Sequence, residues 1–187
     1  ISRWSTKGYH LQHYWHLLSS MHIDFYCGEF DRARERITSE WRPLSRSLLL
    51  ALPSVRHEAL YLRAHSALAL AQSCQTRSER ARCLRQAGKD MRRLSRGKLP
   101  WTQAIAKILR GRWVHLQGYE EEAVDILYEA MVALQQQNMM LHSTAVQFHL
   151  AQLLGGEEGG KLRQKALSWF AQQHVRDPES LTRMLVP

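Results

Sequence analysis

The chain of 187 residues is poor in the residues that interrupt helices, with only five prolines and ten glycines. That scarcity argues against a β-rich fold, which needs many tight turns, and favours long helices. Three cysteines occur without any CxxC pair, so neither a disulfide framework nor a zinc site is indicated. A reduced, cytoplasmic setting is therefore expected. No apolar run approaches the roughly 20 residues that a membrane-spanning helix needs.

Motifs of catalysis are missing as well. The sequence contains no HExxH, no GxSxG, and none of the glycine-rich-loop, HRD-like and DFG segments of a kinase domain. The stretch 155–161 approaches a phosphate-binding loop, but Leu162 stands where a Ser or Thr would hold magnesium. His10, His13 and His16 share helical spacing, but no paired carboxylate stands beside them at ligand spacing. We expect no catalytic residue, cofactor or metal in this segment.

Apolar residues do recur with helical spacing along almost the whole chain. Because 44% of the residues are hydrophobic, the chain can bury a core. The pattern predicts an all-α fold with about four helical hairpins and a short last helix. We expect one domain over residues 1–187, with hairpins over 3–52, 53–97, 98–137 and 138–175 and a C-terminal helix over 178–186.

Prolines, glycines and capping residues set the expected boundaries of these helices. Pro43 lies inside the second helix and predicts a kink or a restart near Trp41. Pro100 favours the first position of the fifth helix. The glycine-rich stretch 155–160 predicts a flexible connection. Asp177, followed by proline, predicts the cap of the last helix.

A short turn followed by an alanine recurs along the chain, and these alanines lie 48, 42 and 43 residues apart. A period near about 40 residues in an all-helical chain is typical of a helical-hairpin solenoid. The alternative is four unrelated hairpins in an ordinary bundle. The recurring pairs are Gly28 and Ala33, Thr76 and Ala81, Gly118 and Ala123, and, less closely, Gly160 and Ala166.

Two stretches resemble known families. Residues 116–123, continued by 128–130, resemble a tetratricopeptide repeat, although the spacing is longer and the closing proline is missing. The tail is similar to the end of large bacterial multidomain serine/threonine protein kinases. It carries this similarity at residues 153–159, at Ala166, Trp169, Gln173 and Val175, and at 177–178 and 184–187.

These resemblances imply a right-handed solenoid of the tetratricopeptide type and a regulatory, sensory or partner-binding role beside a kinase domain. The chain begins at Ile1 without an initiator Met, so we expect a piece of a longer protein whose partner is another protein or another domain of the same chain. The alternative is the repeat domain of a large ATP-dependent transcription regulator.

Charge gives the sharpest local feature. Basic residues outnumber acidic ones by 26 to 17, and the stretch 77–98 alone holds nine basic residues against Glu79 and Asp90. Five of the nine form one stripe on the expected helix, which we call the basic ridge: Arg82, Arg85, Lys89, Arg92 and Arg96. Three interpretations stay open: a solvated outer face, a site for an acidic protein partner, or a site for nucleic acid or an anionic membrane surface.

Six tryptophans are spread along the chain. Because a tryptophan contributes a large apolar surface, we expect each to anchor a hairpin interface in the core. A groove-lining role for one or two of them is the alternative. The six are Trp4, Trp15, Trp41, Trp101, Trp113 and Trp169.

Overall fold

The computed structural model describes residues 8–187, and within them the chain forms helices and no strand. This confirms the all-α prediction. Trp4 lies outside the described residues. The elements are α1 (Leu11–Cys27), α2 (Phe30–Arg46), the 3-10 helix η1 (Leu48–Ala51), α3 (Pro53–Ser73), α4 (Arg77–Ser95), α5 (Pro100–His115), α6 (Glu120–Gln136), α7 (Met140–Leu154), α8 (Gly156–Gln172) and α9 (Pro178–Leu185).

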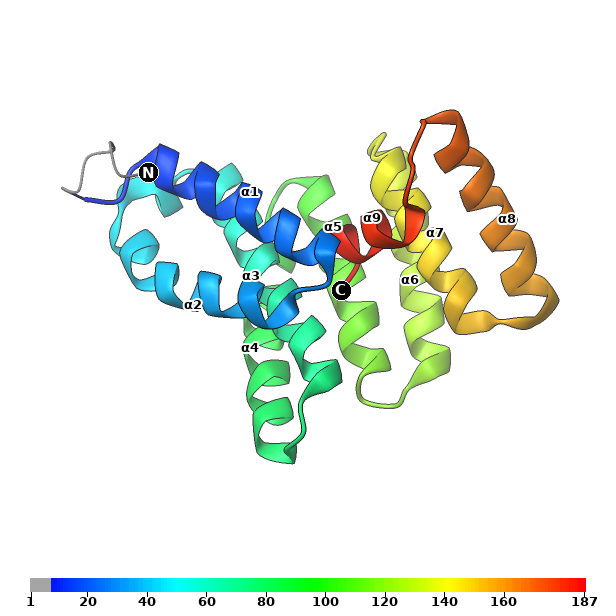
Figure 1. Ribbon diagram of the computed structural model, residues 1–187, viewed down its shortest axis with the longest axis horizontal. Coiled ribbons are helices and arrows are strands. Elements are labelled where there is room, and N and C mark those ends of the chain that lie inside the picture. Colours follow the sequence, from blue (N-terminus) through cyan, green and yellow to red (C-terminus); the bar gives the residue numbers. More distant parts are fainter. Residues whose placement is uncertain (1–7) are drawn as a thin grey trace.

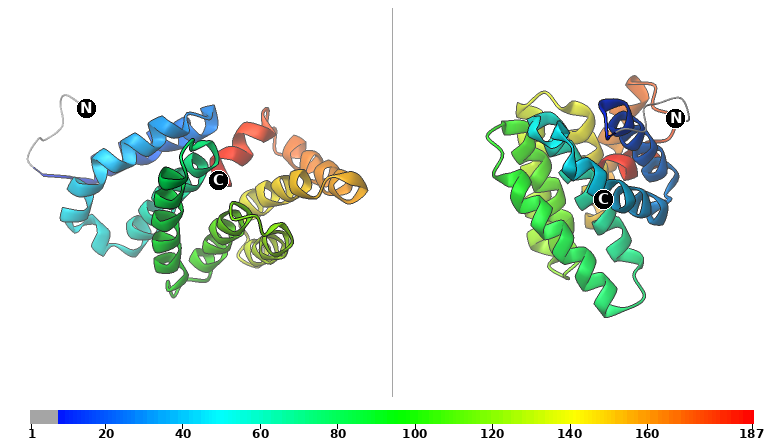
Figure 2. Two further views of the ribbon diagram at one scale, coloured as in Figure 1. Left: turned by 90° about the horizontal axis from the view of Figure 1, so that it is seen from below. Right: turned by 90° about the vertical axis from the view of Figure 1, so that its left-hand side faces the viewer.

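Neighbouring helices pack as hairpins that follow one another in space (Figure 1). The hairpins are α1–α2, α3–α4, α5–α6 and α7–α8, and each is joined to the next by contacts between consecutive helices. Seen from below, they follow an arc, and α9 lies on its inner side (Figure 2). There α9 contacts both α1 and α7, which are far apart in the sequence.

The expected capping signals are confirmed. Pro100 is the first residue of α5, where its missing N–H costs no helical hydrogen bond. The Asp177 carboxylate accepts a hydrogen bond from the backbone N–H of Ser180 at 3.0 Å, which caps α9. A further cap, not predicted from the sequence, lies at the start of α4, where the Thr76 hydroxyl accepts a hydrogen bond from the backbone N–H of Glu79 at 3.2 Å.

Of the predicted kink or restart near Trp41, the restart does not occur. Helix α2 continues through Pro43 and ends at Arg46. Pro43 lies in the last turn, so the backbone hydrogen bond that it removes is one near a helix end. Leu44 is fully buried and holds that last turn against the core.

The prediction of a flexible connection over residues 155–160 is also wrong, because α8 begins at Gly156. Gly155 is the single residue between the two helices, and both Gly155 and Gly156 have a positive φ, at 61° and 55°. Gly159 lies where α8 passes close to α7, and a Cβ atom there would come 2.6 Å from the carbonyl oxygen of Ala151. A glycine at this position therefore permits close helix contact rather than chain flexibility.

The turn-and-alanine pattern is confirmed in part. Ala33, Ala123 and Ala166 are fully buried at helix contacts. Ala81 is only half-buried, and α4 buries Cys83 and Ala87 instead.

The tryptophan prediction also needs correction. Trp15 is 59% exposed, because α1 turns Tyr14 and Leu17 toward the core instead. The other described tryptophans are partly buried and pack against the core: Trp41, Trp101, Trp113 and Trp169.

The close contact at Gly159 gives a matched pair of substitutions. Gly159→Ala should lower the free energy of unfolding by about 1–3 kcal/mol, because the new methyl group meets the Ala151 carbonyl. Gly160→Ala adds the same methyl group where nothing lies within 4 Å, and should stabilise the helix by up to about 1 kcal/mol. Urea denaturation followed by circular dichroism measures both. Equal effects from the two substitutions would show that the helices do not meet closely at Gly159.

Candidate functional site

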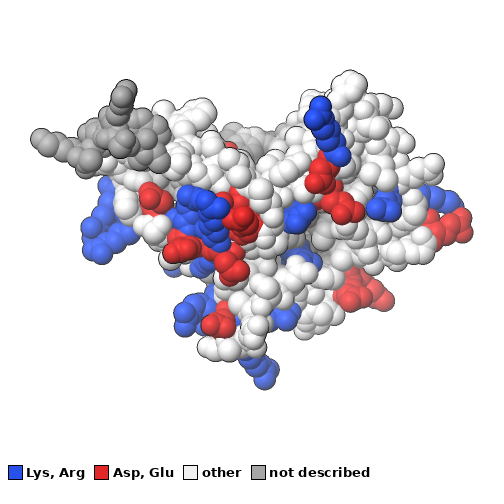
Figure 3. All heavy atoms as spheres, in the orientation of Figure 1, with Lys and Arg blue, Asp and Glu red and all other residues white. Residues whose placement is uncertain are grey.

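The basic ridge occupies the outer face of α4. The five ridge residues, Arg82 to Arg96, are all exposed, whereas Cys83, Ala87 and Leu94 on the opposite face are buried. Figure 3 shows Lys and Arg side chains at the lower end of the molecule, where the α3–α4 hairpin projects. The predicted stripe of positive charge is therefore accessible to a partner along the length of α4.

No acidic side chain neutralises the ridge. Within residues 8–187, none of its five side chains takes part in an ion pair or donates a hydrogen bond. Glu79, at the first turn of α4, accepts a hydrogen bond from the Thr76 hydroxyl at 2.7 Å. Arg80, which lies off the ridge, donates instead to the backbone carbonyl of Leu116. The ridge charges repel one another and are exposed without an acidic partner among the described residues, so they are available to an anionic surface.

Asp90, the other acidic residue of this stretch, points into the molecule. Its carboxylate is fully buried and accepts two hydrogen bonds from the Arg63 guanidinium of α3, one from Nε at 2.7 Å. The Gln86 side chain donates to the same carboxylate at 2.8 Å. Such a two-pronged pair fixes the orientation of α4 against α3. It thereby keeps the ridge on the outside.

The same guanidinium links a third helix to the pair. The Cζ atom of Arg63 lies 3.2 Å from the ring centroid of Trp41, which belongs to α2. A planar guanidinium over an indole face is a favourable cation–π contact. One buried arginine thus connects α2, α3 and α4.

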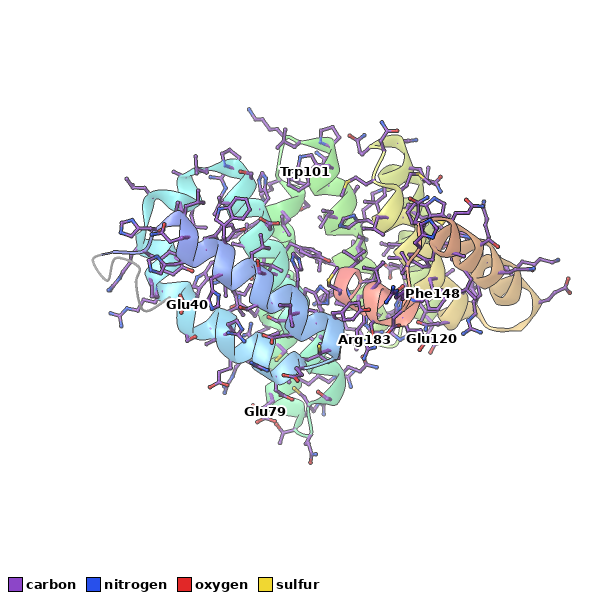
Figure 4. The ribbon with its side chains drawn as sticks, turned by 45° about the horizontal axis from the view of Figure 1, so that its top comes forward. Glu40, Glu79, Trp101, Glu120, Phe148 and Arg183 are labelled. Carbon is purple, nitrogen blue, oxygen red and sulfur yellow. The ribbon has the colours of Figure 1, made fainter. Side chains whose placement is uncertain are left out.

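The inner side of the arc is occupied by the chain itself. The hydroxyl of Tyr61 on α3 donates a hydrogen bond to the backbone carbonyl of Leu185 at 2.7 Å. Leu185 and Val186 are buried. Figure 4 shows Arg183 on α9, and its guanidinium reaches Gly28 at the end of α1 so closely that a Cβ atom there would lie 2.8 Å from it. Helix α9 therefore closes the surface that an arc of hairpins would otherwise present to a ligand.

A buried histidine lies beside this closure. His65 is fully buried and stacks on Phe25, with ring centroids 4.0 Å apart. Among the described residues, neither of its ring nitrogens makes a hydrogen bond of good geometry, although the backbone of Arg183 lies near enough to favour the charged ring. Burial lowers the pKa of His65 to about 3, and nearby His22 adds to the effect. Burial likewise lowers the pKa of His149 to about 3, with Arg112 and His115 contributing.

Other candidate sites gain no support from the geometry. Among the described residues, no group of three or more His, Cys, Asp and Glu side chains is placed to hold a metal ion. His10 and His13 are joined locally, since the His10 backbone N–H donates to Nδ1 of His13 at 3.0 Å. The stretch that approaches a phosphate-binding loop lies within the first turns of α8. No helix in the described part of the chain is long and apolar enough to cross a membrane.

Sequence reasoning found the ridge but missed the pair that orients it. The signals were an arginine within the small, apolar run of α3 and an aspartate among the arginines of α4. The two lie 27 residues apart, so no helical spacing relates them. Sequence reasoning also missed that α9 returns to α1.

Comparisons with known proteins identify no relative that could assign a role to this site. No family model, no curated protein and no solved structure matches the chain. The ridge and its buried support are therefore interpreted from their own geometry.

The buried pair gives a direct test of what orients the ridge. Asp90→Asn leaves the Arg63 guanidinium buried without its counter-charge, and should lower the free energy of unfolding by about 3 kcal/mol or more. Asp125→Asn removes an exposed carboxylate on α6 and should change it by less than about 0.5 kcal/mol. Urea denaturation compares the two variants. A small effect at Asp90 would mean that the pair does not hold the hairpin.

The buried histidine predicts a dependence of stability on pH. Because its pKa is lower in the folded chain than in the unfolded chain, the unfolded chain binds more protons between about pH 6.5 and pH 3. The free energy of unfolding should therefore be highest above about pH 6.5 and fall on acidification. The contribution of His65 reaches about 1.4 kcal/mol per pH unit.

A matched pair of variants isolates this contribution. His65→Leu, which removes the titrating ring at similar volume, should reduce the slope of the dependence on pH, while His149 keeps its own contribution. His174→Asn alters an exposed histidine at φ 57°, a conformation that asparagine tolerates, and should leave the dependence unchanged. Urea midpoints across pH 4 to 8 measure both. An unchanged slope in the His65 variant would show that this residue is not held neutral by the fold.

Proposed function

We propose that this chain is a non-catalytic helical-repeat module of the tetratricopeptide type, and that it binds an acidic protein surface through the basic ridge of α4. The observation that carries the proposal is five exposed cations on one helix face, none of which has an acidic partner within residues 8–187. Long-range attraction to an acidic surface raises the association rate and favours that class of partner.

Because the inner side of the arc is closed by α9, we expect a partner to bind on the outer face. In a solenoid of helical hairpins, the concave side is the usual binding surface. Here α9 lies on that side, and the Tyr61 hydroxyl is hydrogen-bonded to its backbone. The outer face of α4 needs no rearrangement of the fold to meet a partner.

The kinase-like tail supports a larger setting. We propose that the segment belongs to a bacterial multidomain signalling kinase of the cytoplasm, where the partner is another protein or another domain of the same chain. The repeat domain of an ATP-dependent transcription regulator is the alternative. A kinase domain encoded in the same reading frame favours the first, and a helix-turn-helix domain favours the second.

Nucleic acid is the second candidate partner, because the same ridge would attract phosphates. The stretch 77–98 has no aromatic residue on which bases could stack, and this disfavours single strands. A protein that binds phosphates along a duplex loses affinity steeply as salt rises. A direct comparison of duplex DNA with an acidic peptide at the same salt concentration therefore separates nucleic acid from a protein partner.

Charge reversal on the ridge tests the proposal. The variant Arg85→Glu, Arg92→Glu, Arg96→Glu should bind a fluorescent polyglutamate peptide at least about tenfold more weakly than the unaltered chain, as measured by fluorescence anisotropy. Each reversed charge replaces an exposed attraction of up to about 1 kcal/mol with repulsion.

A control of equal charge separates the ridge from net charge. Arg42→Glu, Lys165→Glu, Arg176→Glu changes exposed residues elsewhere, and both triple variants lower the formal net charge from +9 to +3. The control should keep its affinity within about threefold. An equal loss of affinity in both triple variants would show that binding depends on overall charge and not on the ridge. Tighter binding to duplex DNA than to polyglutamate, with a steep salt dependence, would indicate that the partner is nucleic acid and not a protein.

A further inference from the structure

A small hollow opens where the start of α3 meets the end of α4. Its volume is about 300 Å³, at the small end of the range for ligand pockets. Three helices and η1 contribute to its wall. The lining residues are Trp41, Leu50, Arg56, Leu60, Arg93 and Arg96.

One part of the wall is apolar and fixed in place. Leu60 is 4% exposed, and Trp41 and Leu50 are partly buried and pack against the core. The indole of Trp41 is held by the guanidinium of Arg63, which is itself paired with buried Asp90. The apolar wall is therefore set by the core and needs little ordering when a ligand binds.

The other part of the wall is cationic and uncompensated. Among the described residues, Arg56, Arg93 and Arg96 take part in no ion pair. Arg56 donates one hydrogen bond, at 3.4 Å, to the backbone carbonyl of Leu50. Asp90, on the same helix as two of these arginines, is already occupied by Arg63.

The helix dipole accounts for the positions of only some of these arginines. Arg93 and Arg96 lie at the C-terminal end of α4, where positive charge is favoured. Arg56 lies at the fourth position of α3, near the N-terminal end, where positive charge is disfavoured. Apart from its long hydrogen bond to Leu50, Arg56 therefore gains nothing from its place in the helix, and its charge is available to an anion beside Arg93 and Arg96.

We infer that this hollow binds a small organic anion with an apolar body, such as an aryl carboxylate or an aryl phosphate. The body contacts Trp41, Leu50 and Leu60. The anionic group accepts hydrogen bonds from Arg56 and Arg93, whose guanidinium groups match the geometry of a carboxylate or a phosphate. The inference does not depend on the proposed function, and it shares only Arg96 with the basic ridge.

Four probe molecules separate the contribution of the apolar body from that of the anionic group. Phenylpropionate and phenyl phosphate carry both an aromatic body and an anionic group. Phenylpropanol carries the body alone, and inorganic phosphate carries the anion alone. In isothermal titration calorimetry, at least one aryl anion should bind at least about tenfold more tightly than either single-feature probe. Absence of binding by both aryl anions, or equal binding of the alcohol, would overturn the inference.

Two variants and one control locate the binding. Arg56→Gln with Arg93→Gln should weaken aryl-anion binding at least about tenfold. Leu50→Trp, which fills the hollow without changing charge, should also abolish it. Arg82→Gln with Arg85→Gln removes two exposed ridge charges outside the hollow and should leave affinity within about twofold. Circular dichroism confirms that each variant is folded. Equal weakening by the ridge control, or unchanged binding to Leu50→Trp, would place the ligand elsewhere.

Discussion

The buried pair between Arg63 and Asp90 is the interaction on which the arrangement of this region depends. Taking both charges out of water is costly, so the pair is tolerated only because its hydrogen bonds are made and Gln86 completes them. Its effect is orientation: it turns one face of α4 inward, and it holds the indole of Trp41 through the same guanidinium. The outer face of α4 is cationic because the only aspartate in that helix is committed to the interior.

A second constraint is the packing of α9 against α1 and α7. Hairpins arranged in an arc expose an inner surface, and here the chain covers that surface itself, through Tyr61 and the backbone of Leu185. Closure buries His65 in its neutral form, which makes the fold sensitive to acid. It also leaves the outer face of α4 and the hollow beside it as the cationic surfaces that are open to a partner or a ligand.

Much of the helical fold could be predicted from the sequence, because helix ends are local. Pro100 and Asp177 begin their helices as their chemistry requires. The errors arise where tertiary contacts override a local signal. A run of glycines indicates flexibility, but Gly159 lies in a helix at a place where a Cβ atom would clash with the backbone of Ala151. The ridge could be predicted from its spacing, whereas its buried support could not, since Arg63 and Asp90 are related only by packing.

We propose that partners meet this protein on the outer face of α4 while α9 keeps the inner side closed. Amide chemical-shift mapping of the isotopically labelled chain, titrated with an acidic peptide, tests this most directly. The account predicts that the largest shifts fall on α4, between residues 82 and 96, and that the amides of α9 stay unchanged. Shifts concentrated on α9 and on the inner faces of α3 and α7, with α4 unaffected, would contradict it.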